Sequence, residues 1–314
     1  MKEQILGTGL SGLVGSRVVE LNPDLNFVNA SLENGVNILD KKQLKQFFKN
    51  NPEASAIIHF AAFTDTTAAW NQKGDKNGLC YQLNVNGTQN IVDLCKEYHK
   101  HLIHISTDFV FDGTKKTEYT EEDTPHPLDW YGETKYLAEK LIIDSGLPAS
   151  IVRIAFPYRA LSNTKVDFVR KILNKLQNNE PVTMFTDQKT TPTFIDDIGL
   201  GLRFFMDKKP LGIYHLVGSI SQSPYDTAKN IAQVFDLNAD LIRSSSLEDY
   251  LRTPNARPYA KNLSLSNQKF SSEYAGHEYG SIRSRSHSHS RPDHTSGTGP
   301  CQNRLSQKHP CHLY

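Results

Sequence analysis

Short runs of apolar residues alternate with longer segments of helical periodicity from the N-terminus to about residue 155. The runs are of strand length and nearly all apolar, as expected of strands that helices cover on both faces. Predicted strands cover 4–8, 26–30, 55–60, 102–106 and 149–155. Predicted helices cover 12–21, 41–50, 79–98 and 130–145. This alternation predicts an α/β fold with a doubly wound parallel sheet.

The alternation loosens after residue 156. The pattern there predicts helices at 165–176, 195–206 and 225–235, and strands at 182–185 and 213–216. We therefore expect one domain over residues 1–155 that takes further elements from about 193–218. A smaller substrate-binding lobe is expected over 156–270.

The composition changes at residue 271. Residues 271–314 are rich in Ser, His, Arg, Gly and Pro, and only Ile282 and Leu305 are aliphatic between Gly276 and Pro310. Such a segment cannot bury enough apolar surface to offset its ordering entropy, so we expect a low-complexity, disordered tail. The candidate metal ligands of this tail are His309, Cys311 and His312, and their spacing matches no standard ligand pattern. No metal site is expected.

Overall composition argues against several classes of partner. The 314 residues are 38% hydrophobic, with 35 basic and 34 acidic side chains, so neither nucleic acid nor an anionic membrane is an expected partner. Four scattered cysteines do not suggest a disulfide scaffold. No apolar run approaches the roughly 20 residues that span a bilayer. The first strand begins close to Met1, which leaves no room for a leader peptide, and we expect a cytoplasmic protein.

A glycine-rich turn joins the first predicted strand to the first helix, with the sequence Thr-Gly-Leu-Ser-Gly-Leu-Val-Gly over residues 8–15. Gly9 permits a tight turn, Gly12 lets the backbone approach a pyrophosphate, and Gly15 allows close helix packing. The helix N-terminus would offer free N–H groups to the phosphates. At this place in an alternating pattern, the turn predicts a dinucleotide-binding domain of the Rossmann type.

The second strand bears on which dinucleotide is bound. An NAD site usually has an acidic residue at the end of this strand, for the ribose 2′-hydroxyl. Here the strand ends Asn-Ala-Ser at 29–31, and the nearest acid is Glu33. Arg17 is the nearest candidate for a 2′-phosphate, and Asn37 is placed to bond the adenine. We expect NADP(H), with NAD(H) as the alternative.

A hydroxyl and a Tyr-x-x-x-Lys pair form the candidate catalytic set. Tyr131 and Lys135 are four residues apart and share one helix face, and Thr107 ends the fourth strand. A neighbouring ammonium lowers a phenol pKa, so Tyr131 could act as a general acid. Thr107 would donate to the same substrate carbonyl oxygen, and Lys135 would bond the nicotinamide ribose. Gly132 weakens the helix, and close approach of a ligand would explain its presence.

Together these features resemble the extended short-chain dehydrogenase/reductase superfamily over about residues 1–270 and, within it, the dTDP-4-dehydrorhamnose reductase family. The block Ser-Thr-Asp-Phe-Val-Phe-Asp-Gly at 106–113 is similar to that family's Ser-Thr-Asp-Tyr-Val-Phe-Asp-Gly. Four further segments resemble it in the same order: Phe60–Thr64, Asn84–Thr88, Asp187–Thr193 and Ala256–Pro258.

The resemblance implies reduction of the C4 ketone of a nucleotide-linked 4-keto-6-deoxyhexose, in the first place dTDP-4-dehydrorhamnose to dTDP-rhamnose. It implies a monomer or homodimer that binds a nucleotide-sugar. The implied catalytic residues are Thr107, Tyr131 and Lys135. Cofactor contacts are implied for Tyr131 and Lys135. They are also implied for Gly9, Ser11, Gly12, Leu13, Asn37, Ala61, Ala62, Thr64 and Asn84. Substrate contacts are implied for Thr107, Phe109, Phe156 and Arg257.

Departures from the family concern the substrate side. Phe156 stands where the family usually has Trp, and Phe109 replaces Tyr. A nucleotide-sugar 4,6-dehydratase would have an acid at position 109, which argues against that activity. Two alternatives stay open: an epimerase of the same superfamily, and a dinucleotide-binding regulatory subunit resembling the methionine adenosyltransferase beta subunit.

Overall fold

A six-stranded sheet forms the centre of the molecule. The computed structural model describes residues 2–160 and 166–275. All strand pairs in this sheet are parallel, which confirms the predicted α/β fold. The strands lie in the order β2 (Asn26–Ala30), β1 (Gln4–Thr8), β3 (Ala56–His59), β4 (His101–Thr107), β5 (Ala149–Ile154) and β9 (Gly212–His215).

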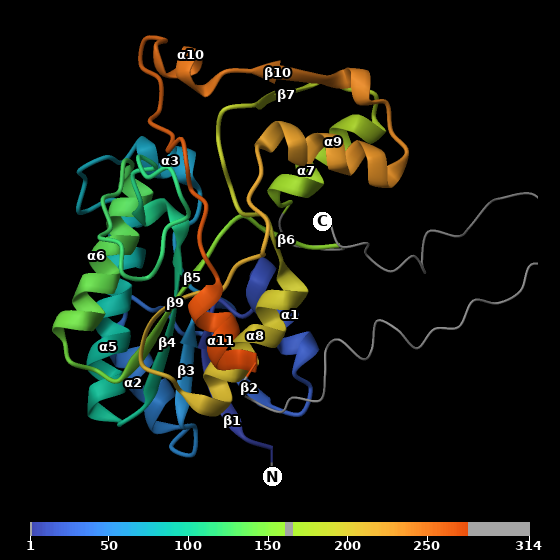
Figure 1. Cartoon of the computed structure of the whole chain (residues 1–314). Coiled ribbons are helices and arrows are strands. Elements are labelled where there is room, and N and C mark those ends of the chain that lie inside the picture. Colours follow the sequence, from blue (N-terminus) through green and yellow to red (C-terminus); the bar gives the residue numbers. More distant parts are fainter. Residues whose placement is uncertain (1, 161–165, 276–314) are drawn as a thin grey trace, which may run out of the picture.

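Helices cover both faces of the sheet, as the apolar strands require (Figure 1). One apolar layer includes α1 (Leu13–Leu21), α8 (Ile195–Lys208) and α11 (Gln268–Ala275). The opposite layer includes α2 (Lys41–Lys49), α5 (Thr88–Glu97) and α6 (Trp130–Asp144). The strand order reverses direction between β1 and β3, so a crevice for a ligand is expected above the carboxyl ends of these two strands.

The helix predicted at 79–98 is interrupted. It consists of α4 (Leu79–Tyr81), the π-helical segment η2 (Gln82–Gly87) and α5. Such segments are common at functional sites, and this one contains Asn84. Further short helices lie in the connections: α3 (Thr66–Trp70), η1 (Leu32–Asn34), η3 (Asp108–Val110) and η4 (Ala239–Leu241).

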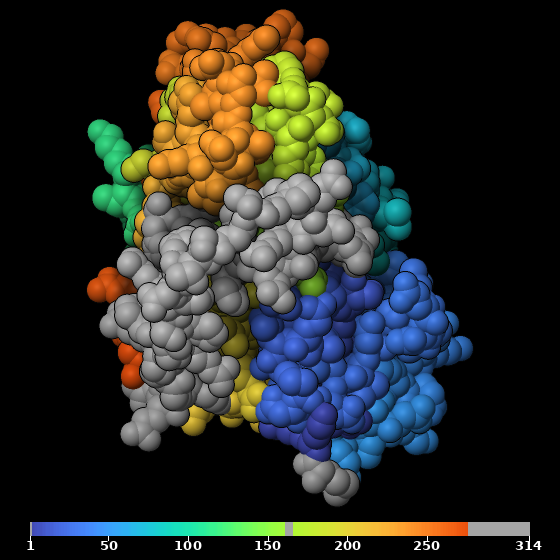
Figure 2. Space-filling model, turned by 90° about the vertical axis from the view of Figure 1, so that its right-hand side faces the viewer, coloured from blue at the N-terminus to red at the C-terminus, as the bar shows by residue number. Residues whose placement is uncertain are grey.

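A smaller lobe lies beyond the carboxyl ends of the strands (Figure 1). Its apolar cluster joins α7 (Phe168–Gln177) and α9 (Pro224–Phe235) to β7 (Val182–Phe185) and β10 (Ile242–Ser245). The lobe also contains α10 (Leu247–Leu251), and β6 (Pro157–Tyr158) pairs with β8 (Thr193–Phe194) near its base. Figure 2 shows the orange and yellow-green lobe segments at one end of the molecule and the blue N-terminal segments at the other.

Helix α11 corrects the predicted tail boundary at residue 271. The helix extends to Ala275, and its Phe270 ring stacks on Phe205 with centroids 5.8 Å apart. Tyr274 packs edge-on against Phe204. Aromatic residues of α11 therefore close one face of the sheet, so the folded part continues past 271. The rest of the predicted tail, with its three candidate ligands, lies outside the described residues.

Two other expectations can be compared with the described part of the chain. Cys80 and Cys95 are both buried and free, in agreement with ordinary thiols. Across residues 2–160 and 166–275, none of the helices combines the length and apolar character needed to cross a bilayer.

Candidate active site

The turn after β1 has the geometry of a phosphate-binding loop. Gly9 has a φ of 68°, and a Cβ there would lie 2.8 Å from the Ala61 nitrogen. At Gly15 a Cβ would lie 2.7 Å from the Gly9 carbonyl oxygen. Gly12 is the N-cap of α1 and provides no side-chain cap, which leaves the start of the helix open to an anion. Ser11 is exposed beside it, and Leu13 begins the helix.

The segment 60–64 is fixed against this turn. The Ala61 N–H donates to Thr8 Oγ1 at 3.1 Å, and that oxygen also contacts His59 Nδ1 at 2.6 Å. Asn84 Oδ1 accepts from the Phe63 N–H at 2.7 Å, and its amide donates to Thr134 of α6 at 2.9 Å. Asn84 therefore joins the segment that contains Ala61, Ala62 and Thr64 to the catalytic helix, a role that the sequence did not suggest.

The contacts around β2 bear on the predicted adenosine side. Arg17 binds Asp196 of α8 through two hydrogen bonds of 2.8 and 2.6 Å, and it also pairs with Glu20. Its guanidinium is therefore engaged in fixing α1 to α8, which removes the reason to choose it for a 2′-phosphate. Asn37 Oδ1 accepts from the Leu39 N–H at 2.9 Å, so an adenine contact would fall to its amide group. The adenine contact itself stays a prediction.

The predicted catalytic hydroxyls lie at the carboxyl end of β4. Thr107 ends this strand, and Tyr131 is in the first turn of α6, whose N-cap Asp129 accepts from the Gly132 N–H at 2.8 Å. Loss of contact with water raises the pKa of the Tyr131 phenol above its usual value, and a hydrogen bond with Thr107 opposes that shift. The side chains are thus adjacent, and the phenol is kept in its protonated form.

Lys135 corrects one expectation about this tyrosine. Its Nζ donates to the Ile105 carbonyl at 2.7 Å and contacts His104 Nε2 at 3.2 Å. Burial lowers the pKa of Lys135 to about 8, although Glu139 opposes the shift. The expected lowering of the Tyr131 pKa by a neighbouring ammonium is therefore wrong for this state, because burial dominates the tyrosine and Lys135 points into the sheet.

Gly132 has a structural explanation that differs from the expected ligand. A Cβ at this position would lie 2.1 Å from the Phe109 carbonyl oxygen and 3.1 Å from Pro127 Cβ. The glycine therefore lets η3, which follows Thr107, pack directly on α6. This approach brings Phe109 edge-on to Tyr131, with ring centroids 5.6 Å apart.

Two departures from the family pattern are neighbours in space. The rings of Phe109 and Phe156 stack with centroids 6.2 Å apart, beside Tyr131. Phe156 has a φ of 40°, a left-handed conformation that costs an aromatic residue about 1–3 kcal/mol. Its carbonyl accepts from the Thr193 N–H at 3.2 Å, which links it to β8. Together the two rings form an apolar wall beside the phenol.

Arg257 connects the last segment of the lobe to the catalytic helix. Its guanidinium donates to Asp129 Oδ2 at 2.5 Å and to Thr66 Oγ1 at 2.9 Å, and it lies over the Tyr259 ring. Both members of the ion pair are buried. The buried Arg257 Nε has no hydrogen-bond partner among the described residues. The structure thus places Arg257 beside the site, and its substrate contact stays a prediction.

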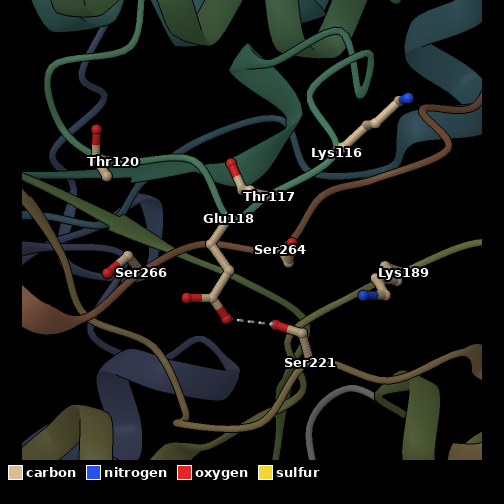
Figure 3. A pocket seen from close by; sticks show the side chains of 8 residues that line it. All are labelled: Lys116, Thr117, Glu118, Thr120, Lys189, Ser221, Ser264 and Ser266. Atoms are coloured by element: carbon tan, nitrogen blue, oxygen red, sulfur yellow. Dashed lines mark hydrogen bonds between the residues drawn. The ribbon is translucent and has the colours of Figure 1, made fainter.

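A separate polar pocket of about 450 Å³ lies among four loops (Figure 3). Glu118 points across it to Ser221, with 3.5 Å between the Glu118 carboxylate and the hydroxyl. None of its lining residues is a predicted site residue: Lys116, Thr117, Glu118, Thr120, Lys189, Ser221, Ser264 and Ser266.

The parallel sheet, the glycine turn at β1, the adjacent Thr107 and Tyr131, and Lys135 one turn further along α6 define an extended short-chain dehydrogenase/reductase. The model of one family, the RmlD substrate binding domain, matches residues 1–279. The chain belongs to this family.

Similar proteins differ in their named functions. The chain is 30% identical over 275 residues to probable low-salt glycan biosynthesis reductase Agl14 of Haloferax volcanii, with 83% of this chain and 89% of that protein covered. It is 29% identical over 254 residues to methionine adenosyltransferase 2 subunit beta of Rattus norvegicus, covering 76% and 74%. A solved dTDP-4-dehydrorhamnose reductase of Bacillus anthracis, in complex with NADP, superposes with a TM-score of 0.78 at 25% identity, covering 87% and 93%.

Proposed function

We propose that this protein is an NAD(P)H-dependent reductase of the C4 ketone of a nucleotide-linked 4-keto-6-deoxyhexose. The observation that carries the proposal is the pairing of a protonated Tyr131 with Thr107 at the carboxyl end of β4. Phe109, in place of a dehydratase acid, lies edge-on to that phenol. The first substrate to test is dTDP-4-dehydrorhamnose, because a structural neighbour is a reductase of that sugar.

The residues present fit a dinucleotide. Gly9, Ser11, Gly12 and Leu13 would hold its phosphates at the start of α1, and the 60–64 segment would line the adjoining wall. NADPH is the expected cofactor, because no carboxylate ends β2, and the NADP in the solved neighbour supports this choice. When bound, the reduced nicotinamide supplies hydride. We place the protein in the cytoplasm and expect a monomer or homodimer.

The chain's own residues supply the proton and the orientation of the ketone. Tyr131 donates its phenolic proton to the carbonyl oxygen, and the raised pKa keeps that proton available at neutral pH. Thr107 donates a second hydrogen bond to the same oxygen. Lys135, with a pKa of about 8, remains largely cationic at neutral pH and would bond the nicotinamide ribose.

The test is turnover by the purified chain with NADPH and dTDP-4-keto-6-deoxy sugars, followed by the loss of reduced-nicotinamide absorbance. Stoichiometric oxidation of NADPH supports the reductase. The similarity to methionine adenosyltransferase 2 subunit beta favours one second candidate, a regulatory subunit. Tight dinucleotide binding without turnover of any nucleotide-4-ketosugar would select that candidate.

A further inference from the structure

The hydroxyl of Thr107 has two close polar neighbours besides Tyr131. Its oxygen accepts from the Phe109 N–H at 3.3 Å and lies 2.9 Å from Asp108 Oδ1. A threonine has one hydroxyl proton, and an ionised carboxylate can only accept. An ionised Asp108 therefore accepts the one hydrogen bond that the Thr107 hydroxyl can donate, and none is left for a substrate. When Asp108 carries a proton, the direction of this hydrogen bond can reverse, and Asp108 donates to Thr107 Oγ1.

The surroundings of Asp108 favour its protonated form. Asp108 is 1% exposed, and within the described residues its second oxygen, Oδ2, has no hydrogen-bond partner. Burial, with a smaller contribution from the charge of Asp129, raises the pKa of this carboxyl to about 7. The hydrogen bonds from Thr107 and the backbone oppose the shift.

The charged and titratable groups nearby come from two other elements. Tyr131 and Asp129 belong to the start of α6 and interact electrostatically with Asp108. Arg257 of the last lobe segment is directed to Asp129, at 2.5 Å.

We propose that Asp108 is a positioning residue that, in its protonated form, donates to Thr107 and so frees the Thr107 proton for the substrate carbonyl oxygen. The inference rests on the proposed reductase function and deepens it. No proton leaves Asp108 during turnover: its acid proton stays in the hydrogen bond to Thr107 Oγ1, while Tyr131 gives the proton that ends on the product. When Asp108 ionises, Thr107 donates its hydrogen bond to the Asp108 carboxylate and no longer to the substrate ketone.

The inference gives a pH dependence with a definite sign. Above the pKa of Asp108 the carboxylate accepts the Thr107 hydrogen bond, so kcat falls by up to about tenfold per pH unit. The fall ends where the remaining donors alone set kcat. Asp108→Asn keeps an N–H donor toward Thr107 at every pH. Its kcat should therefore stay level through about pH 7 and fall only as Lys135 loses its proton around pH 8.

The experiment compares the kcat profiles of wild type, Asp108→Asn and Asp112→Asn with NADPH and the ketosugar. Asp112 is the matched control, because it lies in the same segment and its pKa is lowered. A level profile for Asp108→Asn alone supports the inference. If kcat of Asp108→Asn falls with pH as it does in wild type, the inference is overturned. It is also overturned if Asp108→Asn changes the kcat profile just as much in a Thr107→Val background, where the hydroxyl is absent.

A second measurement separates this inference from the proposed function. If wild type does not reduce any ketosugar, the reductase fails, and the carboxyl is followed directly by infrared difference spectra of wild type against Asp108→Asn. A protonated-carboxyl signal that titrates near pH 7, with a higher midpoint in Thr107→Val, supports the hydrogen-bond switch. An Asp108 that is already ionised at about pH 6 overturns it.

Discussion

The two sides of the candidate site are held together in different ways. On the cofactor side, Thr8 and Asn84 accept hydrogen bonds from the 60–64 segment, and the Asn84 amide donates to α6, so the segment is fixed to the phosphate loop and to that helix. On the substrate side, Phe109 and Phe156 stack, and Arg257 forms one buried ion pair. The first side is joined by directional hydrogen bonds between polar groups, whereas the second depends on ring packing and one buried charge pair. We therefore expect the redox chemistry to depend on the polar groups and the sugar preference on this packing.

The largest expected effect on kcat comes from a change at Tyr131, which lies between the two sides of the candidate site. Tyr131→Phe removes the proton donor and should lower kcat by about 10²–10⁴-fold, because that is the usual contribution of a general acid. NADPH affinity should remain close to wild type, since the phosphate loop is unchanged. Steady-state kinetics and a binding titration measure the two quantities. Tyr136→Phe, on the same helix, is the control, and equal activity in both variants would contradict the assignment.

Breaking the ion pair should weaken the substrate side selectively. Arg257→Met leaves Asp129 buried without its cation, which should cost about 3–5 kcal/mol in the free energy of unfolding. Arg252→Met, in the same segment, removes two ion pairs, to Glu248 and Asp249. Because Arg252 is 68% exposed, this change should cost only about 0–1 kcal/mol. Urea unfolding compares them. Similar losses in the two variants would show that burial of the Arg257 pair does not matter.

An added methyl group at Gly132 tests the contact between η3 and α6. Gly132→Ala places a Cβ against the Phe109 carbonyl, so we expect a loss of about 1–3 kcal/mol in stability together with reduced kcat. Glu133→Ala changes an exposed neighbour on the same helix and should have little effect. Thermal unfolding and turnover are measured on both. A fully stable, fully active Gly132→Ala protein would refute the close packing.

The smallest expected effect concerns the apolar wall. Phe109→Tyr adds a hydroxyl near the ketone site and should change the ratio of kcat/KM between two ketosugars by about 2–10-fold, the value of one hydrogen bond. The NADPH dissociation constant should not change. Phe235→Tyr, an exposed position of the lobe, controls for the added hydroxyl. An altered NADPH affinity with unchanged sugar preference would reverse the assignment of Phe109 to the substrate side.

The same division explains what the sequence could predict. The bounds of β1 and β2 follow from local patterns, and the structure confirms them. The π-helical segment at Asn84 and the packing at Gly132 depend on atoms from other elements, so no local pattern shows them. The direction of Lys135 depends on β4 and on burial in the same way. Sequence thus predicted that Thr107 and Tyr131 lie together, but not which of the hydrogen bonds at the site are already used.

The most direct test of the central claim is the fate of the transferred hydrogen. The chain is incubated with dTDP-4-keto-6-deoxy sugar and NADPH deuterated at the transferred position, and the sugar product is analysed by NMR. The account predicts one deuterium at C4 of the sugar with stoichiometric NADPH oxidation, and nearly complete loss of this product with Tyr131→Phe. A sugar epimerised without deuterium, or no product despite bound NADPH, would contradict it.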